Sequence, residues 1–128
     1  MEGKMTISDS ELEILEVLWS AGTALNANEI RAALNEHKSW ERTTVLTLIQ
    51  RLLKKGALTQ EKREVYYYTP CIAREAYVNA ETKNFINKFF HGSFRNLTAA
   101  LVDSDALTQK DIEELRDYFN HRRKGDSQ

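Results

Sequence analysis

The sequence predicts a mainly α-helical protein with one small β-hairpin, divided into an N-terminal domain and a helical C-terminal domain. Three observations support this fold class: apolar residues recur at helical spacing, two short β-prone runs lie together between residues 58 and 69, and the composition changes after Pro70. The chain has 128 residues, of which 41% are hydrophobic and 29% charged, as in an ordinary globular protein. It has room for one domain, or for a small domain with an appendage that needs a partner.

The charge is distributed unevenly, although the net charge of −1 by itself favours no class of partner. Between Glu41 and Glu64 there are six cations and three acids, which gives a local charge of +3. A basic segment on an otherwise acidic chain is typical of a module that contacts phosphate groups. Most charged helix faces are simply solvated, but the hairpin that follows this segment favours the first interpretation.

Several classes of protein are disfavoured by what the sequence lacks. Cys71 is the only cysteine, so one chain can form neither a disulfide nor a cysteine-based metal site, and we expect a cytoplasmic location. There is no apolar signal core and no stretch near the ~20 apolar residues that cross a bilayer, so membrane insertion is not expected. The histidines are scattered, and no HExxH, GxSxG or phosphate-binding glycine loop occurs. We therefore expect no enzyme activity, no metal and no cofactor.

Capping signals place the first two helices. Ser8 with Glu11, and Asn26 with Glu29, each have the spacing of a capping box. The first helix should begin near residue 9 and end at Gly22, and the second should end near residue 37. Both are amphipathic, as expected for helices that pack on a shared core.

The third predicted helix, which follows Trp40 and ends at Lys54-Lys55-Gly56, has two chemically different faces. One face is apolar and should pack on the core: Val45, Leu48, Ile49, Leu52 and Leu53. The opposite face can donate hydrogen bonds and includes three cations: Arg42, Thr43, Thr44, Thr47, Gln50, Arg51 and Lys54.

Two predicted strands follow, at about residues 58–62 and 65–69, with Arg63-Glu64 between them. A two-residue hairpin loop favours Gly, Asn or Asp because it needs a positive φ, so the sequence leaves open a longer loop. Tyr66 and Tyr68 share one face of the second strand and Tyr67 has the other, and the sequence does not decide which face is buried. A helix with a cationic outer face followed by a small hairpin is the order of a winged helix-turn-helix, which places that helix in the major groove of DNA.

The predicted partner is therefore double-stranded DNA. Threonine can offer its hydroxyl to a base edge and its methyl to thymine, so the first turns of the third helix supply the base-contact candidates: Arg42, Thr43, Thr44 and Thr47. For Arg42 the sequence leaves base and phosphate open as targets. The candidates for phosphate contact are Arg51, Lys54, Lys62, Arg63 and Tyr67.

The N-terminal domain should span residues 1–70, followed by a helical domain over 71–122 and a disordered tail over 123–128. The helical domain should contain helices at about 72–90 and 94–102 and a last helix capped by Thr108. About fifty residues bury too little surface to be stable alone, so we expect them to pair with a second chain, the alternative being a monomer folded back on the first domain. The residues expected at the dimer contact are apolar: Phe85, Ile86, Phe89, Phe90, Phe94, Leu97, Leu101, Ile112, Leu115 and Phe119.

With these residues in place, the chain resembles the BlaI/MecI/CopY family of bacterial transcriptional repressors along nearly its whole length. The resemblance is most specific over Thr43–Pro70 and continues over Thr82–Phe94 and Leu107–Phe119. It implies a homodimer whose N-terminal winged helices bind a palindromic operator while the C-terminal helices form the dimerisation domain. It also implies control of β-lactam resistance genes.

The branches of the family differ in how the repressor is released. The copper-responsive branch uses a C-terminal pair of Cys-x-Cys motifs, which this chain lacks. The β-lactam branch is cleaved in the C-terminal domain, downstream of a membrane sensor-transducer protease, and the matching bond here is Ala100–Leu101. The family's Asn-Phe at that bond is absent. The alternatives are a repressor that answers a small ligand or metal directly, and a winged-helix protein-interaction module without DNA binding.

Overall fold

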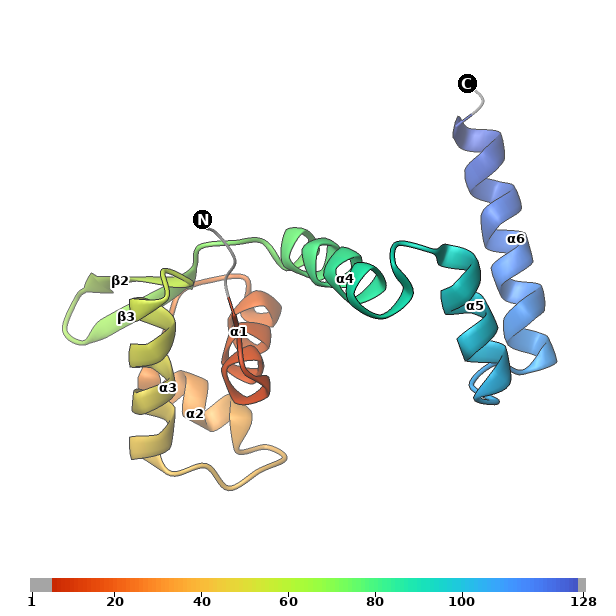
Figure 1. Ribbon diagram of the computed structural model, residues 1–128. Coiled ribbons are helices and arrows are strands. Elements are labelled where there is room, and N and C mark those ends of the chain that lie inside the picture. Colours follow the sequence, from red (N-terminus) through yellow and green to blue (C-terminus); the bar gives the residue numbers. More distant parts are fainter. Residues whose placement is uncertain (1–5, 127–128) are drawn as a thin grey trace. The chain divides into compact units, whose positions relative to one another are not determined.

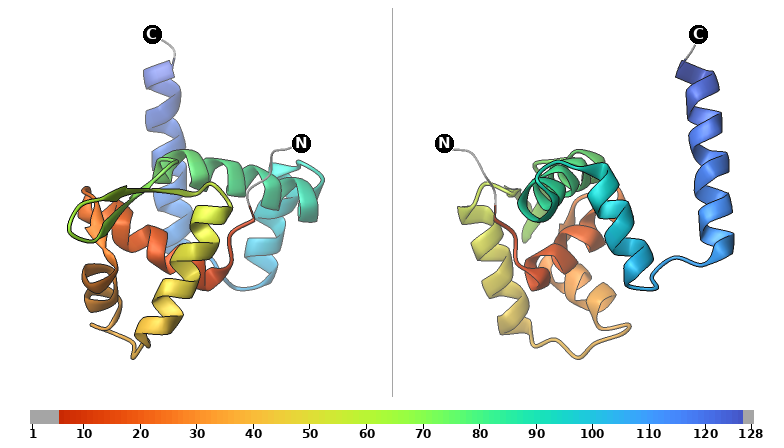
Figure 2. Two further views of the ribbon diagram at one scale, coloured as in Figure 1. Left: turned by 90° about the vertical axis from the view of Figure 1, so that its left-hand side faces the viewer. Right: turned by 45° about the vertical axis from the view of Figure 1, so that its right-hand side comes forward.

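The chain forms two compact units, Met1–Val78 and Asn79–Gln128. A computed structural model describes residues 6–126, with side chains over residues 6–122 (Figures 1 and 2). The elements in order are α1 (Asp9–Ala21), β1 (Leu25–Asn26), α2 (Ala27–Leu34), α3 (Arg42–Lys54), β2 (Leu58–Lys62), β3 (Tyr66–Pro70), α4 (Arg74–Phe90), α5 (Phe94–Asp103) and α6 (Gln109–Asp126).

The predicted capping boxes are confirmed at the starts of α1 and α2. The side chains of Ser8 and Asn26 each accept a hydrogen bond from the backbone N–H three residues later. The glutamate at that later position accepts one in return from the backbone N–H of the capping residue. Gly22 ends α1 in the left-handed conformation with φ 69°, as expected. Helix α2 ends at Leu34, earlier than predicted, because the Asn35 side chain accepts a hydrogen bond from Trp40 N at 2.7 Å and draws the chain into a turn.

The hairpin belongs to a three-stranded antiparallel sheet in the order β1-β3-β2. The two-residue strand β1, which pairs with the middle of β3, was not predicted because it is too short to show alternation. Lys62 pairs with Tyr66, so the loop has three residues, 63–65, and is longer than the Arg63-Glu64 pair drawn from the sequence. It closes through a hydrogen bond from Arg63 N to Val65 O at 3.0 Å, without a positive φ, which explains why no glycine is needed.

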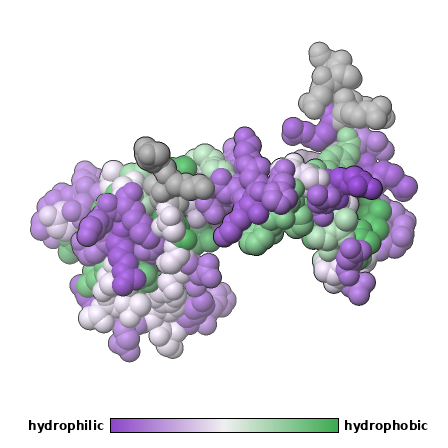
Figure 3. Space-filling model, viewed as in Figure 1, coloured by the Kyte–Doolittle hydropathy of each residue, from purple (hydrophilic) through white to green (hydrophobic). Residues whose placement is uncertain are grey.

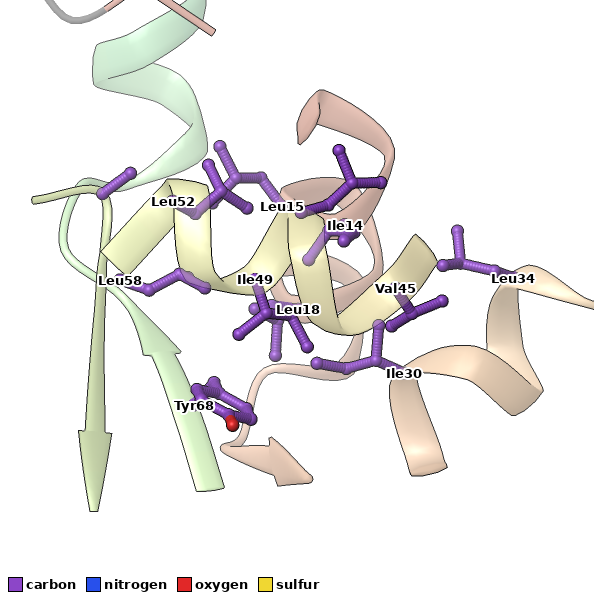
Figure 4. Packing of buried hydrophobic residues seen from close by; sticks show 12 residues of the cluster. Ile14, Leu15, Leu18, Ile30, Leu34, Val45, Ile49, Leu52, Leu58 and Tyr68 are labelled. Atoms are coloured by element: carbon purple, nitrogen blue, oxygen red, sulfur yellow. The ribbon is translucent and has the colours of Figure 1, made fainter. Parts of the chain in front are cut away.

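The core of the first unit lies between the three helices and the sheet (Figure 4). Helix α3 contributes the apolar face predicted for it, and Tyr68 closes the core from β3. Burial, together with the nearby Tyr66, raises the pKa of Tyr68. The buried side chains shown in Figure 4 come from five elements: Ile14, Leu15, Leu18, Ile30, Leu34, Val45, Ile49, Leu52, Leu58 and Tyr68.

The first unit continues past Pro70, where the sequence placed the domain boundary, to Val78. The first turn of α4 and the segment just before it are bound to α1 by contacts between residues far apart in the chain. Trp19 Nε1 donates to Ile72 O at 2.9 Å, and the Trp19 ring lies 5.9 Å from that of Tyr77. The Arg74 guanidinium also bonds the Glu16 carboxylate at 2.8 Å.

The second unit consists of the rest of α4, α5 and α6. The loops between its helices lie where the sequence predicted them. Gly92, with φ 81°, lies between α4 and α5, Ser93 caps α5, and Thr108 caps α6. Helix α6 continues to Asp126, into the segment predicted as a disordered tail, while residues 127–128 lie outside the described part. No helix within residues 6–126 is both long and apolar enough to cross a membrane.

No described side chain between residues 79 and 122 is buried within the single chain. Phe85, Phe89 and Phe94 are each exposed over half of their surface or more. Aromatic rings nevertheless approach one another, with Phe94 and Phe119 edge to face at 5.9 Å. Figure 3 shows apolar surface over the C-terminal helices.

An ion pair between a buried glutamate and a partly exposed lysine joins the start of α1 to the end of α3. The side chain of Glu11 is 1% exposed and accepts hydrogen bonds from Lys55 Nζ at 2.5 Å and from Ser8 N at 2.9 Å. Burial by itself raises the pKa of Glu11, but the hydrogen bonds from Lys55 and Ser8 outweigh it and lower the pKa below 4.5. A cation counted in the basic segment therefore serves to stabilise the fold.

Replacing Lys55 with Met should lower the free energy of unfolding at pH 7 by about 3 kcal/mol, because it leaves a buried carboxylate without its cation. The native pair contributes fully above the unfolded-state pKa of about 4.5 and is lost as pH falls through the lower folded-state pKa. The difference between the two proteins should therefore shrink on acidification, as urea denaturation at several pH values can measure. Lys54→Met, at an exposed neighbour, should cost less than about 0.5 kcal/mol, and a pH-independent difference for Lys55→Met would contradict the argument.

Candidate nucleic-acid interface

The outer face of α3 carries the residues that the sequence placed there. Its inner face is anchored in the core by Val45, Leu48, Ile49 and Leu52. The helical period then turns the remaining positions outward, and the side chains on that side are all exposed: Arg42, Thr43, Thr44, Thr47, Gln50, Arg51 and Lys54. The structure therefore brings the four base-contact candidates together on the first turns of one helix.

The cations at the end of α3 differ in their availability. Lys55 is bound to Glu11 and also donates to Thr6 O at 2.7 Å. Arg51 and Lys54 are exposed and form no ion pair with any residue in the described part of the chain. Positive charge on this surface therefore comes from Arg51 and Lys54, which an anionic partner can reach.

The tip of the hairpin holds two cations against tyrosine rings. Lys62 Nζ lies 4.7 Å from the centre of the Tyr66 ring, and the Arg63 guanidinium lies 4.4 Å from that of Tyr67. Arg63 also bonds the exposed carboxylate of Glu61 at 3.0 Å. Such contacts restrict the rotamers of these long side chains, while the charged groups remain largely hydrated. Lys62 lies directly opposite Tyr66 across the hairpin, which is a sequence signal that could have revealed that contact, whereas Arg63 lies in the loop and Tyr67 is opposite Glu61.

Tyr67 connects the hairpin to the start of α2. Its ring is half-buried, and its hydroxyl oxygen accepts a hydrogen bond from Asn26 Nδ2 at 3.3 Å. Asn26 also caps α2 through its side-chain oxygen. The hydroxyl hydrogen of Tyr67 remains available to an acceptor, because the bond to Asn26 uses only an oxygen lone pair.

Sequence reasoning missed one residue of this surface, Asn28. Arg42, at the start of α3, donates from Nη1 to Asn28 Oδ1 at 2.6 Å, and both residues are exposed. The contact crosses from α3 to the first turn of α2. No local pattern marks Asn28, because only the crossing of the two helices brings it beside Arg42.

The surface made by α3 and the hairpin is rich in hydrogen-bond donors and includes two cations, Arg51 and Lys54, that pair with no acidic residue among those the structure describes. This combination suits phosphate oxygens, which only accept, and the edges of bases in a groove wide enough for a helix. Among the described residues, no group of three or more His, Cys, Asp or Glu side chains is placed to hold a metal ion.

Comparison with known proteins gives concordant matches. A family model described as penicillinase repressor matches residues 7–121. The chain is similar to a penicillinase repressor of Bacillus licheniformis, with 34% identity over 110 residues, 85% of each chain. It is also similar to the methicillin resistance regulatory protein MecI of Staphylococcus aureus (strain N315), with 35% identity over 117 residues, 91% of this chain and 94% of that protein. The solution structure of the DNA-binding domain of the repressor BlaI matches with 39% identity and a TM-score of 0.51, covering 58% of this chain and 90% of that one.

Replacing Tyr67 with Leu should release Arg63, because it removes the ring beneath the guanidinium. NMR of the free protein should show the side-chain protons of Arg63 shifted upfield by the ring in the wild type and moved toward random-coil positions in Tyr67→Leu. Tyr67→Phe is the matched control, since it keeps the ring and loses only the hydroxyl. Equal Arg63 shifts in the Phe and Leu variants would show that the ring does not hold the cation.

Proposed function

The chain belongs to the penicillinase repressor family, and from that premise we propose that it is a bacterial transcriptional repressor that binds operator DNA as a homodimer. The observation that carries the proposal is the outer face of α3, where exposed hydrogen-bond donors lie opposite the buried face that fixes the helix. The protein would act in the cytoplasm, where bacterial operators lie. Its role is that of a binding protein rather than an enzyme.

Recognition would follow from placing α3 in the major groove. Thr43, Thr44 and Thr47 lie on its first turns, where a hydroxyl can meet a base edge and a methyl can pack on thymine. The cations later along the chain would contact phosphate groups on either side of the groove and add affinity with little sequence preference: Arg51, Lys54, Lys62 and Arg63.

The second unit would supply the dimer. Its helices leave large apolar side chains in water, with Phe89 and Phe94 each 58% exposed and Phe119 49% exposed. Apolar surface on this scale is stabilised by burial against a partner, and a second copy offers the same surface under two-fold symmetry. Two DNA-binding units held together match two half-sites, so the loss of the dimer should release the operator.

Cleavage in α5 would be one route to that release, as part of a pathway that begins at a membrane sensor-transducer for β-lactams. The candidate bond, Ala100–Leu101, lies inside α5. The Ala100 carbonyl accepts from Ser104 N at 3.0 Å, and that of Leu101 accepts from Ala106 N at 3.1 Å. Proteases bind extended backbone, so the end of α5 must unwind before this bond can be cut, and the cut would separate α6 from α4.

Binding to duplex DNA tests the proposal, with a site selected by the protein from a randomised pool as the probe. If each monomer neutralises three or four phosphates, the log of the affinity should fall with log salt at a slope of roughly −5 to −7 for the dimer. Thr47→Ala should cost about 1–2 kcal/mol at selected base pairs and leave the slope unchanged, whereas Lys54→Ala should weaken all sequences alike. Failure of the wild type to bind any duplex at low salt would favour a winged-helix module for protein interaction instead.

Replacing Phe89 with Ala should weaken the dimer by about 2 kcal/mol, because it removes a large apolar side chain from the proposed interface. Leu101→Ala should act in the same direction. Both should weaken operator binding although neither residue lies in the DNA-binding unit, as sedimentation and gel-shift titrations can measure. Lys83→Ala, at an exposed polar position of α4, is the control. An intact dimer with unchanged DNA affinity in Phe89→Ala would refute the assignment of this surface.

A further inference from the structure

The contact between Arg42 and Asn28 is not part of the cap of either helix. Asn26, not Asn28, caps α2, and α3 begins at Arg42 without a side-chain cap. Both side chains of the contact are exposed, yet the Nη1–Oδ1 distance is 2.6 Å. An arginine at an exposed helix start would otherwise sample many rotamers, so the asparagine holds the guanidinium in place.

The chemistry of the pair fixes what it presents to a ligand. A guanidinium has donors and no acceptor, so it must bond the amide oxygen of Asn28, and this sets the orientation of the amide. The Nδ2 group of Asn28 and the remaining guanidinium N–H groups have no partner in the described part of the chain. The pair thus offers donors from both residues, which suits a group that carries only acceptors, such as a phosphate. Among the base edges in the major groove only that of guanine, with O6 and N7, also offers two acceptors and no donor, so the choice between the two depends on where the pair lies.

The position of the pair favours phosphate. In a helix-turn-helix the second helix enters the major groove while the first crosses the DNA backbone. The contact holds the Arg42 side chain against the first turn of α2, the helix that would cross the DNA backbone in this arrangement. We infer that Asn28 is a positioning residue that directs Arg42 to a DNA phosphate and donates from Nδ2 to the same phosphate group.

This inference rests on the proposed function and deepens it. It assigns Arg42 to phosphate rather than to the base edges proposed from its place at the start of the third helix. It also adds Asn28 to the DNA-binding surface. Contacts with base edges are then made by Thr43, Thr44 and Thr47. Arg42 and Asn28, on the same surface, contact phosphate.

The test compares Arg42→Ala, Asn28→Ala, the double variant and Asn28→Asp, using the duplex selected by the wild-type protein and a random duplex of equal length. Arg42→Ala should weaken binding about tenfold on both duplexes and reduce the salt slope by about one per monomer. Asn28→Ala should weaken binding about fivefold, and the double variant should be little weaker than Arg42→Ala, because the two residues act through one contact.

Asn28→Asp separates positioning from direct contact. The aspartate can still hold Arg42 but has no donor and adds a negative charge beside the phosphate, so it should bind DNA more weakly than Asn28→Ala. Asn79→Ala, at an exposed asparagine of α4, should match the wild type. Because Asn28 is exposed and is not a cap, thermal unfolding of all variants should stay close to that of the wild type.

Three results would overturn the inference. One is a change in the base selected at one position by Arg42→Ala with an unchanged salt slope, which would make Arg42 a base reader. Another is wild-type affinity in Asn28→Ala, or full additivity in the double variant. The third is Asn28→Asp binding as well as the wild type. If the wild type itself binds no duplex at low salt, the proposed function fails as well, so the two failures can be told apart.

Discussion

The structure depends on the burial of one face of α3. Val45, Ile49 and Leu52 are almost completely buried among the side chains of α1, α2 and the sheet, and this packing fixes both the position of the helix and its rotation about its axis. A helix held by one face must leave the opposite face in solvent. The threonines and cations of that face are therefore presented by a rigid element, as a recognition surface requires if few side chains are to define its geometry.

Tertiary contacts then sort the positive charges of the basic segment by role. Lys55 neutralises the buried Glu11, whereas Arg51 and Lys54 lie on the surface and form no ion pair within the part of the chain that the structure describes. At the hairpin tip, tyrosine rings hold Lys62 and Arg63, and at the start of α3 an asparagine holds Arg42. These three cations are thus partly ordered in the free protein, and if they contact DNA as proposed, less side-chain entropy is lost on binding.

The two units differ in how far they bury their apolar side chains. The first has a closed core of its own, which extends into the first turn of α4 through Trp19 and Tyr77. The second leaves four phenylalanines about half-exposed and buries no described side chain: Phe85, Phe89, Phe94 and Phe119. Stability in the second unit would thus come with association, and a regulator built in this way can be switched off by attacking its assembly without altering the surface that reads DNA.

The sequence alone determined the elements whose signals are local. Capping boxes at Ser8 and Asn26, the glycine after α3 and the two faces of that helix depend on residues within a few positions of one another, so their pattern was sufficient. The exposed candidates on α3 follow from the same periodicity. Only the tertiary structure decided the features that join distant parts of the chain: strand β1, the three-residue hairpin loop, the burial of Tyr68, and the contacts Glu11–Lys55 and Asn28–Arg42. Each of these depends on how separate helices and strands cross, and no spacing along the chain records that crossing.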